Sequence, residues 1–145
     1  RDFVTYQPHW YRITIDGKTF RRKAFVVTVA NTSQFGNNAF IAPRAKVDDG
    51  LLDICILKPF PVGMAPDLAL RLFNRQLDGS KYCEYFQGKE IKIEGETLGF
   101  QVDGEPFVNT EPLNLYVETK SLNILIPEPT ESLLARLSLD KLMKF

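Results

Sequence analysis

The chain has 145 residues, and its 18 Lys and Arg balance its 18 Asp and Glu, so its formal net charge is zero. A neutral chain lacks the broad positive field that a nucleic-acid backbone requires, which argues against nucleic acid as a partner. Hydrophobic residues make up 44% of the sequence, which excludes a disordered chain. No apolar run reaches the roughly 18 residues that a membrane-spanning helix needs. The length suits one domain with a core of its own.

The two cysteines, Cys55 and Cys83, are too few for a disulfide framework and favour a reducing, cytoplasmic compartment. Cys55 lies in the apolar run 51–57, where a buried free thiol is expected. The single histidine, His9, stands near the start of the chain, so the sequence gives little support for a catalytic Cys–His pair.

Alternating apolar residues over 11–15 predict a half-buried strand, and Asp16-Gly17 predicts a tight hairpin turn into 18–20. The β-branched run 25–30 is typical of a strand buried on both faces. A polar loop is expected over 31–38, and a second buried strand over 51–57.

One internal helix is predicted over 66–77, because Pro66 suits a first turn and the apolar residues recur on one face. These residues are Ala69, Leu72, Phe73 and Leu77. Further strands are expected over 91–93, 98–102, 113–117 and 122–126, with a turn at 103–106 and a helical or extended tail over 132–145. Short strands separated by frequent turns predict a mainly β protein, with an antiparallel sandwich or barrel as its architecture.

Two acidic turns could carry chemistry. Asp48 and Asp49 precede the run 51–57, and strand alternation would point one toward solvent and the other inward. A carboxylate at a turn, with backbone carbonyls beside it, suits a hard cation such as Mg²⁺ or Ca²⁺. Asp103 and Glu105 flank a glycine, and a carboxylate on a rigid turn can take a proton from a hydroxyl. For both turns the alternative is a purely structural role. The one basic run, 21–23, is either a solvated strand end or a site for an anionic head group.

Several segments together resemble the C-terminal domain of the diacylglycerol kinase and sphingosine kinase superfamily, with the soluble bacterial lipid kinases most similar. The first carries Val29-Ala30-Asn31 and Gly36. The second runs from Ile41-Ala42-Pro43-Arg44-Ala45-Lys46-Val47 through Asp48-Asp49-Gly50-Leu51-Leu52-Asp53, and the third is Val102-Asp103-Gly104-Glu105-Pro106. The matched segments span about half of the chain, from Val29 to Pro106.

The resemblance implies a two-domain enzyme that transfers the γ-phosphoryl group of ATP to a lipid hydroxyl in the cleft between its domains. The family's nucleotide motif, Gly-Gly-Asp-Gly-Thr, is absent from this chain, which begins with Arg1. Residues 1–145 are therefore expected to be the β-sandwich half alone, inactive without its N-terminal nucleotide-binding domain. A lipid substrate also implies peripheral contact with a membrane surface. The oligomeric state is left open, a homodimer included.

The resemblance also assigns roles to single residues. Asp49, with the backbone carbonyls of Lys46 and Leu51, matches a structural Mg²⁺ site, and Asn31 matches an asparagine near the cleft. Asp103 and Glu105 match the acidic pair that supplies the general base, without deciding which of the two it is. The run of glycines that often follows the asparagine is reduced here to Gly36.

Two other functions remain as alternatives. A non-catalytic β-sandwich module could bind a lipid or a carbohydrate through an aromatic face, for which Trp10, Tyr11, Phe100 and Tyr116 are available. A hydrolase with paired carboxylates is less well supported, because Asp103 and Glu105 share one turn and a glycosidase needs its carboxyl groups on opposite sides of a bond.

Overall fold

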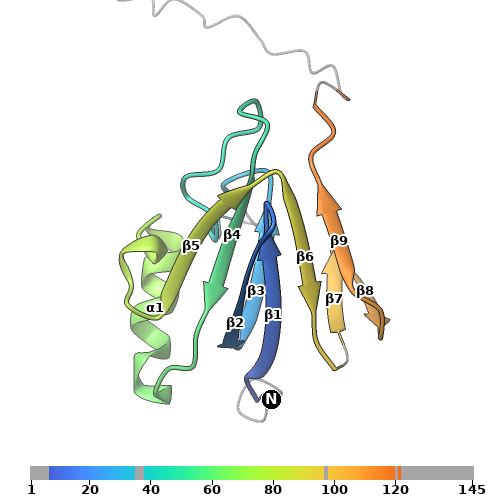
Figure 1. The fold of residues 1–145 in the computed structure, drawn as a ribbon. Helices are drawn as coiled ribbons and strands as arrows, with labels where there is room; N and C mark the ends of the chain where they lie inside the picture. The colour runs from blue at the N-terminus through green and yellow to red at the C-terminus, as the bar shows by residue number, and fades with distance from the viewer. Residues whose placement is uncertain (1–6, 35–37, 97, 120, 122–145) are drawn as a thin grey trace, which may run out of the picture.

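The computed structural model describes residues 7–34, 38–96, 98–119 and 121, which form three antiparallel sheets and one α-helix (Figure 1). The first sheet has the order β2-β1-β6-β9. Its strands are β1 (His9–Ile15), β2 (Lys18–Ala24), β6 (Glu90–Glu94) and β9 (Leu113–Tyr116). The second sheet has the order β3-β4-β5, from β3 (Val26–Ala30), β4 (Leu52–Leu57) and β5 (Cys83–Gly88). The third is the hairpin of β7 (Leu98–Val102) and β8 (Glu105–Asn109). The fold is therefore mainly β, as predicted.

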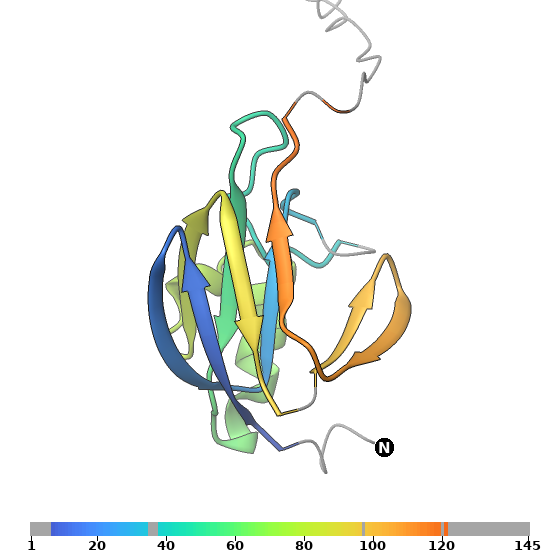
Figure 2. The same cartoon turned by 45° about the vertical axis from the view of Figure 1, so that its right-hand side comes forward.

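The main core lies between the first two sheets, which pack as a sandwich (Figure 2). Alternation along β1 and β6 turns one apolar face of the first sheet inward, and β4 supplies the second sheet's largest buried side chains. The buried members are Ile13, Ile15, Ala24, Ile54, Ile56, Ile91, Ile93 and Leu98. Burying each isoleucine removes apolar surface from water and contributes about 1.5–3 kcal/mol.

A helical layer covers the other face of the second sheet. It consists of the 3₁₀ turn η2 (Val62–Met64), helix α1 (Ala65–Phe73) and the 3₁₀ turn η3 (Leu77–Gly79). A second core packs beneath this layer from Cys55, Leu68, Leu77 and Cys83. Strand β4 therefore contributes buried side chains to cores on both of its faces, which explains its nearly continuous apolar sequence.

The hairpin between β1 and β2 turns at Asp16 and Gly17, whose φ angles of 46° and 80° are those of a type I′ turn. The Asp16 carboxylate accepts hydrogen bonds from the backbone N–H groups of Lys89 and Glu90, each at 2.9 Å. These bonds hold the pKa of Asp16 below its usual range. They also anchor the turn to the start of β6, so the predicted turn residue has a tertiary role as well.

Several sequence predictions need correction. The helix ends at Phe73 instead of continuing to residue 77, because the chain turns at Arg75, whose φ is 59°. Its buried side chain is Leu68, while Phe73 is 55% exposed. Strand β3 is an edge strand with one exposed end, so the run 25–30 is not buried on both faces. The strand expected over 18–20 extends to residue 24 and so includes the basic run 21–23. Strands β5 and β8 were not predicted, and residues 105 and 106 of the expected turn belong to β8.

The predicted strand 122–126 and tail 132–145 lie outside the described residues, as does Gly36. Within the part of the chain that the structure describes, no helix has the length and apolar character required to cross a bilayer.

Candidate functional site

A groove of about 530 Å³ runs between edge strand β3 and the β7–β8 hairpin. Strand β3 forms one wall along its whole length, and strand β7 forms the other. Figure 2 shows the hairpin of β7 and β8 to one side of the sandwich. The floor consists of inward-facing side chains from the first sheet, namely Tyr11, Ile93, Leu113 and Leu115. The groove is therefore an opening between the two sheets at the side where β3 has no neighbouring strand in the described chain.

The lining of the groove is mostly apolar and includes some polar side chains. Val27, Val29 and Phe100 line the apolar part. Asn31 and Asp103 both line the groove, although they lie far apart in the sequence. Two of the predicted site residues are thus brought to one cavity, Asn31 by the end of β3 and Asp103 by the hairpin turn.

The turn that presents Asp103 is a two-residue hairpin with Val102 opposite Glu105. Asp103 has a φ of 50° and Gly104 a φ of 90°, and both angles lie in the left-handed region that a type I′ turn requires. Asp tolerates this region better than most residues do, and Gly has no Cβ to clash. The Asp-Gly sequence is therefore needed for the turn, whatever chemistry its carboxylate performs.

Glu105 belongs to β8 and is exposed. By register its side chain shares a face of the hairpin with Val102, Phe100 and Phe107. The rings of Phe100 and Phe107 stack with their centroids 5.5 Å apart, and Leu98 on the same face enters the main core. Glu105 therefore lies on the face that turns toward the sandwich, although it does not line the groove.

The predicted metal ligands lie in the turn before β4, apart from the groove. Asp49 accepts a hydrogen bond from the Leu51 backbone N–H at 2.9 Å, and Gly50 has a φ of 69°. Asp48 and Asp49 are both exposed, so neither turns inward as strand alternation had suggested. They precede the first residue of β4, and the alternation of a strand does not extend to them.

The donors near Asp49 are chemically suited to a hard cation, because a carboxylate and backbone carbonyls offer only oxygen. No cluster of three or more His, Cys, Asp or Glu side chains that could hold a metal exists among the described residues. A site built on Asp49, Lys46 and Leu51 would therefore contain one charged ligand and would leave several positions to water, as Mg²⁺ sites commonly do.

Asp53 is a buried carboxylate that the sequence did not single out as a candidate site residue. It is 0% exposed within β4, and its Oδ1 accepts a hydrogen bond from Gln87 Nε2 at 3.2 Å. Its Oδ2 has no hydrogen-bond partner among the described residues and lies beside a hollow of about 120 Å³ lined by Arg44, Tyr85 and Phe86. Burial raises the pKa of the carboxyl, and the Gln87 bond offsets part of that rise. The sequence feature that could have identified Asp53 as a buried carboxylate is its position as a charged residue within an apolar run.

The aromatic residues proposed for a binding module do not form one face. Tyr11 and Phe100 line the groove, whereas Trp10 and Tyr116 alternate outward from β1 and β9. The aromatic face expected for the carbohydrate- or lipid-binding alternative is therefore absent from the described structure.

Comparison with known proteins agrees with a β-sandwich architecture. A family model described as the YegS C-terminal NAD kinase beta sandwich-like domain matches residues 1–126. The chain belongs to this family of YegS-type C-terminal domains, which is part of the lipid kinase and diacylglycerol kinase group.

Individual relatives point the same way. A protein of Shewanella frigidimarina named "Probable lipid kinase YegS-like" is 31% identical over 123 residues, which cover 84% of this chain and 39% of the relative. A protein of the same name from Chromohalobacter salexigens is 28% identical and covers 70% of this chain and 33% of the relative. A crystal structure from Bacillus anthracis, described as a "putative diacylglycerol kinase", superposes with a TM-score of 0.62 at 25% identity. It covers 78% of this chain and 39% of its own. The chain thus spans less than two fifths of the length of these relatives.

Proposed function

We propose that this chain is the lipid-binding half of an ATP-dependent lipid kinase, and that the groove between β3 and the β7–β8 hairpin receives the acceptor lipid. The observation that carries the proposal is the polarity of the groove. Most of its lining residues are apolar, and the lining also contains Asn31 and Asp103. A lipid alcohol has the same division, with apolar chains and one reactive hydroxyl.

The dimensions of the groove support this assignment. A volume of about 530 Å³ lies within the range of roughly 300–1,000 Å³ typical of small-molecule sites. It would hold a glycerol head group and the first part of its acyl chains, while the remainder extends out of the open side. Burial of those methylene groups would supply about 0.8 kcal/mol each.

The hairpin would supply the general base. Phosphoryl transfer depends mainly on positioning and on charge stabilisation, and the protein must also remove the proton of the attacking hydroxyl. Asp103 lines the groove, and Glu105 lies on the hairpin face that turns toward the sandwich. Either carboxylate could accept this proton, and Asn31 would then orient the head group through its amide. ATP would be bound by the N-terminal domain of the complete enzyme.

The proposed kinase activity is tested with the full-length coding sequence. Purified full-length protein is incubated with labelled ATP, Mg²⁺ and diacylglycerol in mixed micelles, and the labelled lipid is extracted and counted. We expect labelled phospholipid from the full-length protein and none from residues 1–145 alone. An upstream sequence without a Gly-Gly-Asp-Gly-Thr-like motif, or no labelled lipid from any lipid alcohol tested, would contradict the proposal.

We also propose that Asp49 and the carbonyls of Lys46 and Leu51 hold a structural Mg²⁺ ion. This ion would brace the turn that leads into β4, and we assign it no part in the reaction. Addition of Mg²⁺ should then raise the melting temperature of the chain, and Asp49→Ala should abolish that rise. Asp48→Ala is the matched control, because it removes the neighbouring exposed carboxylate. Melting that is indifferent to Mg²⁺ would exclude the site.

A further inference from the structure

Cys55 and Cys83 are buried nucleophilic groups that neither the groove nor the proposed metal site uses. Cys55 is 2% exposed and Cys83 is 8% exposed. Both belong to the second core, which packs beneath the helical layer, and both are free thiols. Free buried cysteines usually serve as small apolar side chains, so a reactive pair requires a geometry that packing alone does not demand.

The register of the second sheet brings the two sulfur atoms together. Cys55 on β4 is directly opposite Tyr85, and Cys83 on β5 is directly opposite Leu57, so the cysteines occupy diagonal positions on the same face of the sheet. Their Sγ atoms are 2.8 Å apart. Non-bonded carbon atoms pack at about 3.5–4.0 Å, and sulfur is larger than carbon, so this distance is shorter than packing contact requires. A disulfide bond measures about 2.05 Å, so the two sulfur atoms need to approach by less than about 1 Å to form one.

The contact between the two thiols also makes them chemically unequal. The hydrogen bond that links them lowers the pKa of Cys83, although burial opposes that effect. The same bond, together with burial, raises the pKa of Cys55. A thiolate is the nucleophilic form of cysteine, so Cys83 is the group suited to attack an oxidant and Cys55 is the thiol suited to resolve the product.

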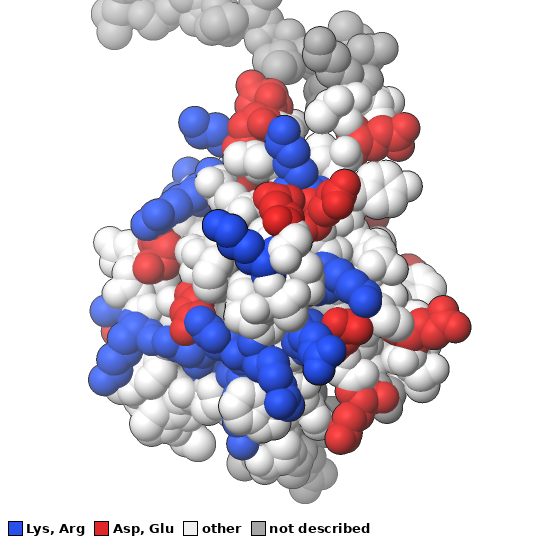
Figure 3. Space-filling view, in the orientation of Figure 1, with Lys and Arg blue, Asp and Glu red and all other residues white. Residues whose placement is uncertain are grey.

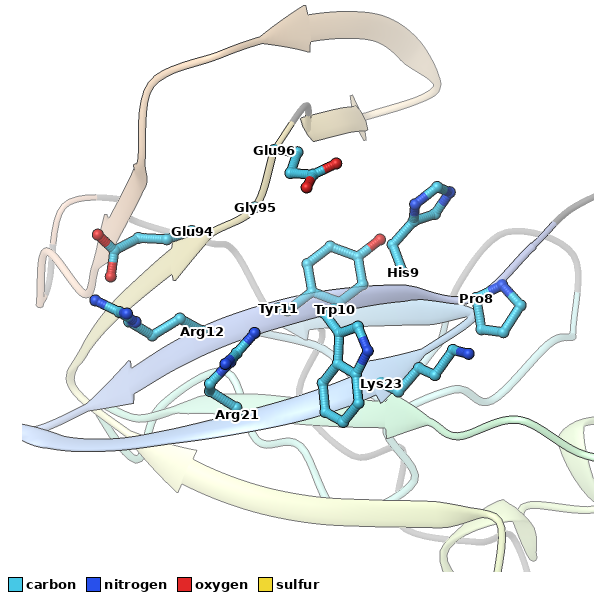
Figure 4. A pocket seen from close by; sticks show the side chains of 10 residues that line it. All are labelled: Pro8, His9, Trp10, Tyr11, Arg12, Arg21, Lys23, Glu94, Gly95 and Glu96. Carbon is cyan, nitrogen blue, oxygen red and sulfur yellow. The ribbon is translucent and has the colours of Figure 1, made fainter.

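The surroundings of the pair limit the kind of oxidant that can reach it. Charged side chains lie across the surface of the protein, as Figure 3 shows for one face. The hollow of about 570 Å³ on the outer face of the first sheet is also lined by charged residues, among them Arg12, Arg21 and Glu94 (Figure 4). The thiol pair lies instead among apolar side chains in the second core. A small neutral oxidant such as hydrogen peroxide is therefore the suitable reagent, and Cys83, the more exposed of the two thiols, meets it first.

We propose that Cys55 and Cys83 form a redox modification site, at which hydrogen peroxide converts the two thiols to a disulfide that links β4 to β5. The Cys83 thiolate attacks one peroxide oxygen, the O–O bond breaks, and the departing hydroxide takes up the proton that Cys83 released and becomes water. The Cys55 thiol then attacks the Cys83 sulfenic acid, the S–S bond forms, and the sulfenic hydroxyl leaves with the Cys55 proton as a second water. The two sulfur atoms together give up two electrons, which reduce the peroxide. This inference goes beyond the kinase proposal, since the reaction requires neither ATP nor the lipid groove.

The disulfide would enclose the helical layer in a covalent loop. Residues 56–82 lie between the two cysteines and contain η2, α1 and η3. A disulfide that closes a loop of this kind stabilises a protein mainly by restricting its unfolded chain. Oxidation should therefore raise the melting temperature by about 5–15 °C, and a reducing thiol should reverse the change.

The test treats the reduced chain with hydrogen peroxide, blocks the remaining thiols with N-ethylmaleimide in urea, and measures the intact mass. We expect the untreated chain to gain two maleimide groups. The oxidised chain should gain none and should be lighter by two hydrogen atoms, and dithiothreitol should restore both thiols. The melting temperature is measured on the same samples, and a disulfide that leaves it unchanged would contradict the closure of the helical layer.

Cys55→Ser and Cys83→Ser are the matched variants, because each keeps one of the two thiols. In Cys55→Ser the Cys83 sulfenic acid should persist and react with dimedone, and oxidation should leave the melting temperature unchanged. In Cys83→Ser the remaining buried thiol should stay reduced. Equally rapid oxidation of the two variants would overturn the assignment of Cys83 as the attacking group.

Results from the unmodified chain decide the proposal even if a variant does not fold. Two thiols that still accept maleimide after peroxide treatment would overturn it. So would a disulfide between two copies of the chain, or conversion of Cys83 to a sulfinic acid while Cys55 remains a thiol. Because no ATP or lipid is present, failure here is distinct from failure of the kinase assay.

Discussion

The substitution Asp53→Asn tests the most unusual buried group in the structure. The carboxylate is 0% exposed and receives one side-chain hydrogen bond, from Gln87 at 3.2 Å. An unsatisfied buried polar group costs about 1–3 kcal/mol, and a charged one costs more. Asn retains the Gln87 bond through its carbonyl oxygen and removes the charge. We therefore expect the variant to be about 1–2 kcal/mol more stable at pH 7, which corresponds to a rise of about 3–6 °C in melting temperature.

The stability difference between the native protein and the Asp53→Asn variant should depend on pH. The pKa of Asp53 is raised above its ordinary value of 3.8, so the folded state holds the proton more tightly than the unfolded state does. The native protein therefore loses stability as the pH rises from about 3.8 through the folded-state pKa, and the variant does not. The two should converge in stability below pH 3.8.

The assay is thermal or urea unfolding of both proteins from pH 3 to pH 8. Asp48→Asn is the control, since it makes the same chemical change at an exposed position five residues earlier, and should leave stability nearly unchanged. A variant less stable than the native protein at pH 7, or a difference that stays constant with pH, would refute this account of the buried carboxylate.

Two further substitutions test packing and charge. A Cβ at Gly88 would overlap Cγ2 of Ile15 in the core, so Gly88→Ala should lower the free energy of unfolding in urea by about 1–3 kcal/mol. An unchanged free energy of unfolding would show that β5 does not approach β1 this closely. Burial opposes ionisation of Glu84, but Arg22 and Lys58, at 2.7 and 3.1 Å, hold its pKa below the ordinary 4.5. The ionised Glu84 carboxylate therefore stabilises the fold above pH 4.5, and this stabilisation is lost on acidification. Glu84→Gln should lower the free energy of unfolding by about 1 kcal/mol at pH 7 and by less at pH 3. A larger loss at pH 3 than at pH 7 would exclude the two ion pairs.

The sequence predicts those strands whose patterns are local. The alternation over 11–15 and the Asp16-Gly17 turn define the first hairpin, and the apolar run 51–57 defines a strand with two buried faces. The helix prediction extends too far because Leu77 continues its apolar spacing. Leu77 is indeed buried, but in a separate 3₁₀ turn that follows a change of direction at Arg75.

Other elements depend on contacts that a linear pattern does not show. Strand β5 contains Glu84 at a position whose charge is balanced by Arg22 on β2, so its alternation is obscured. Strand β8 begins with Glu105 and Pro106, which by themselves indicate a turn. Pro106 is accepted because β8 pairs with a single strand, β7, in the described structure.

The candidate site is predictable in its residue types but not in its arrangement. The motifs identify Asn31 and Asp103, yet their position in one groove follows from the placement of β3 at a sheet edge beside the hairpin. The basic run 21–23 shows the same limit. Its middle residue, Arg22, pairs with Glu84 across the sandwich, and only Arg21 and Lys23 face outward beside Trp10.

The most direct test of the central claim compares the turnover of the full-length enzyme with that of its Asp103→Asn and Glu105→Gln variants. If the hairpin supplies the base, one of them should reduce the rate of lipid phosphorylation by about 10²–10⁴-fold while the protein remains folded. Glu111→Gln, at an exposed position just beyond β8, is the matched control and should keep the native rate. Native turnover in both hairpin variants would contradict the assignment of the groove and its hairpin as the catalytic site.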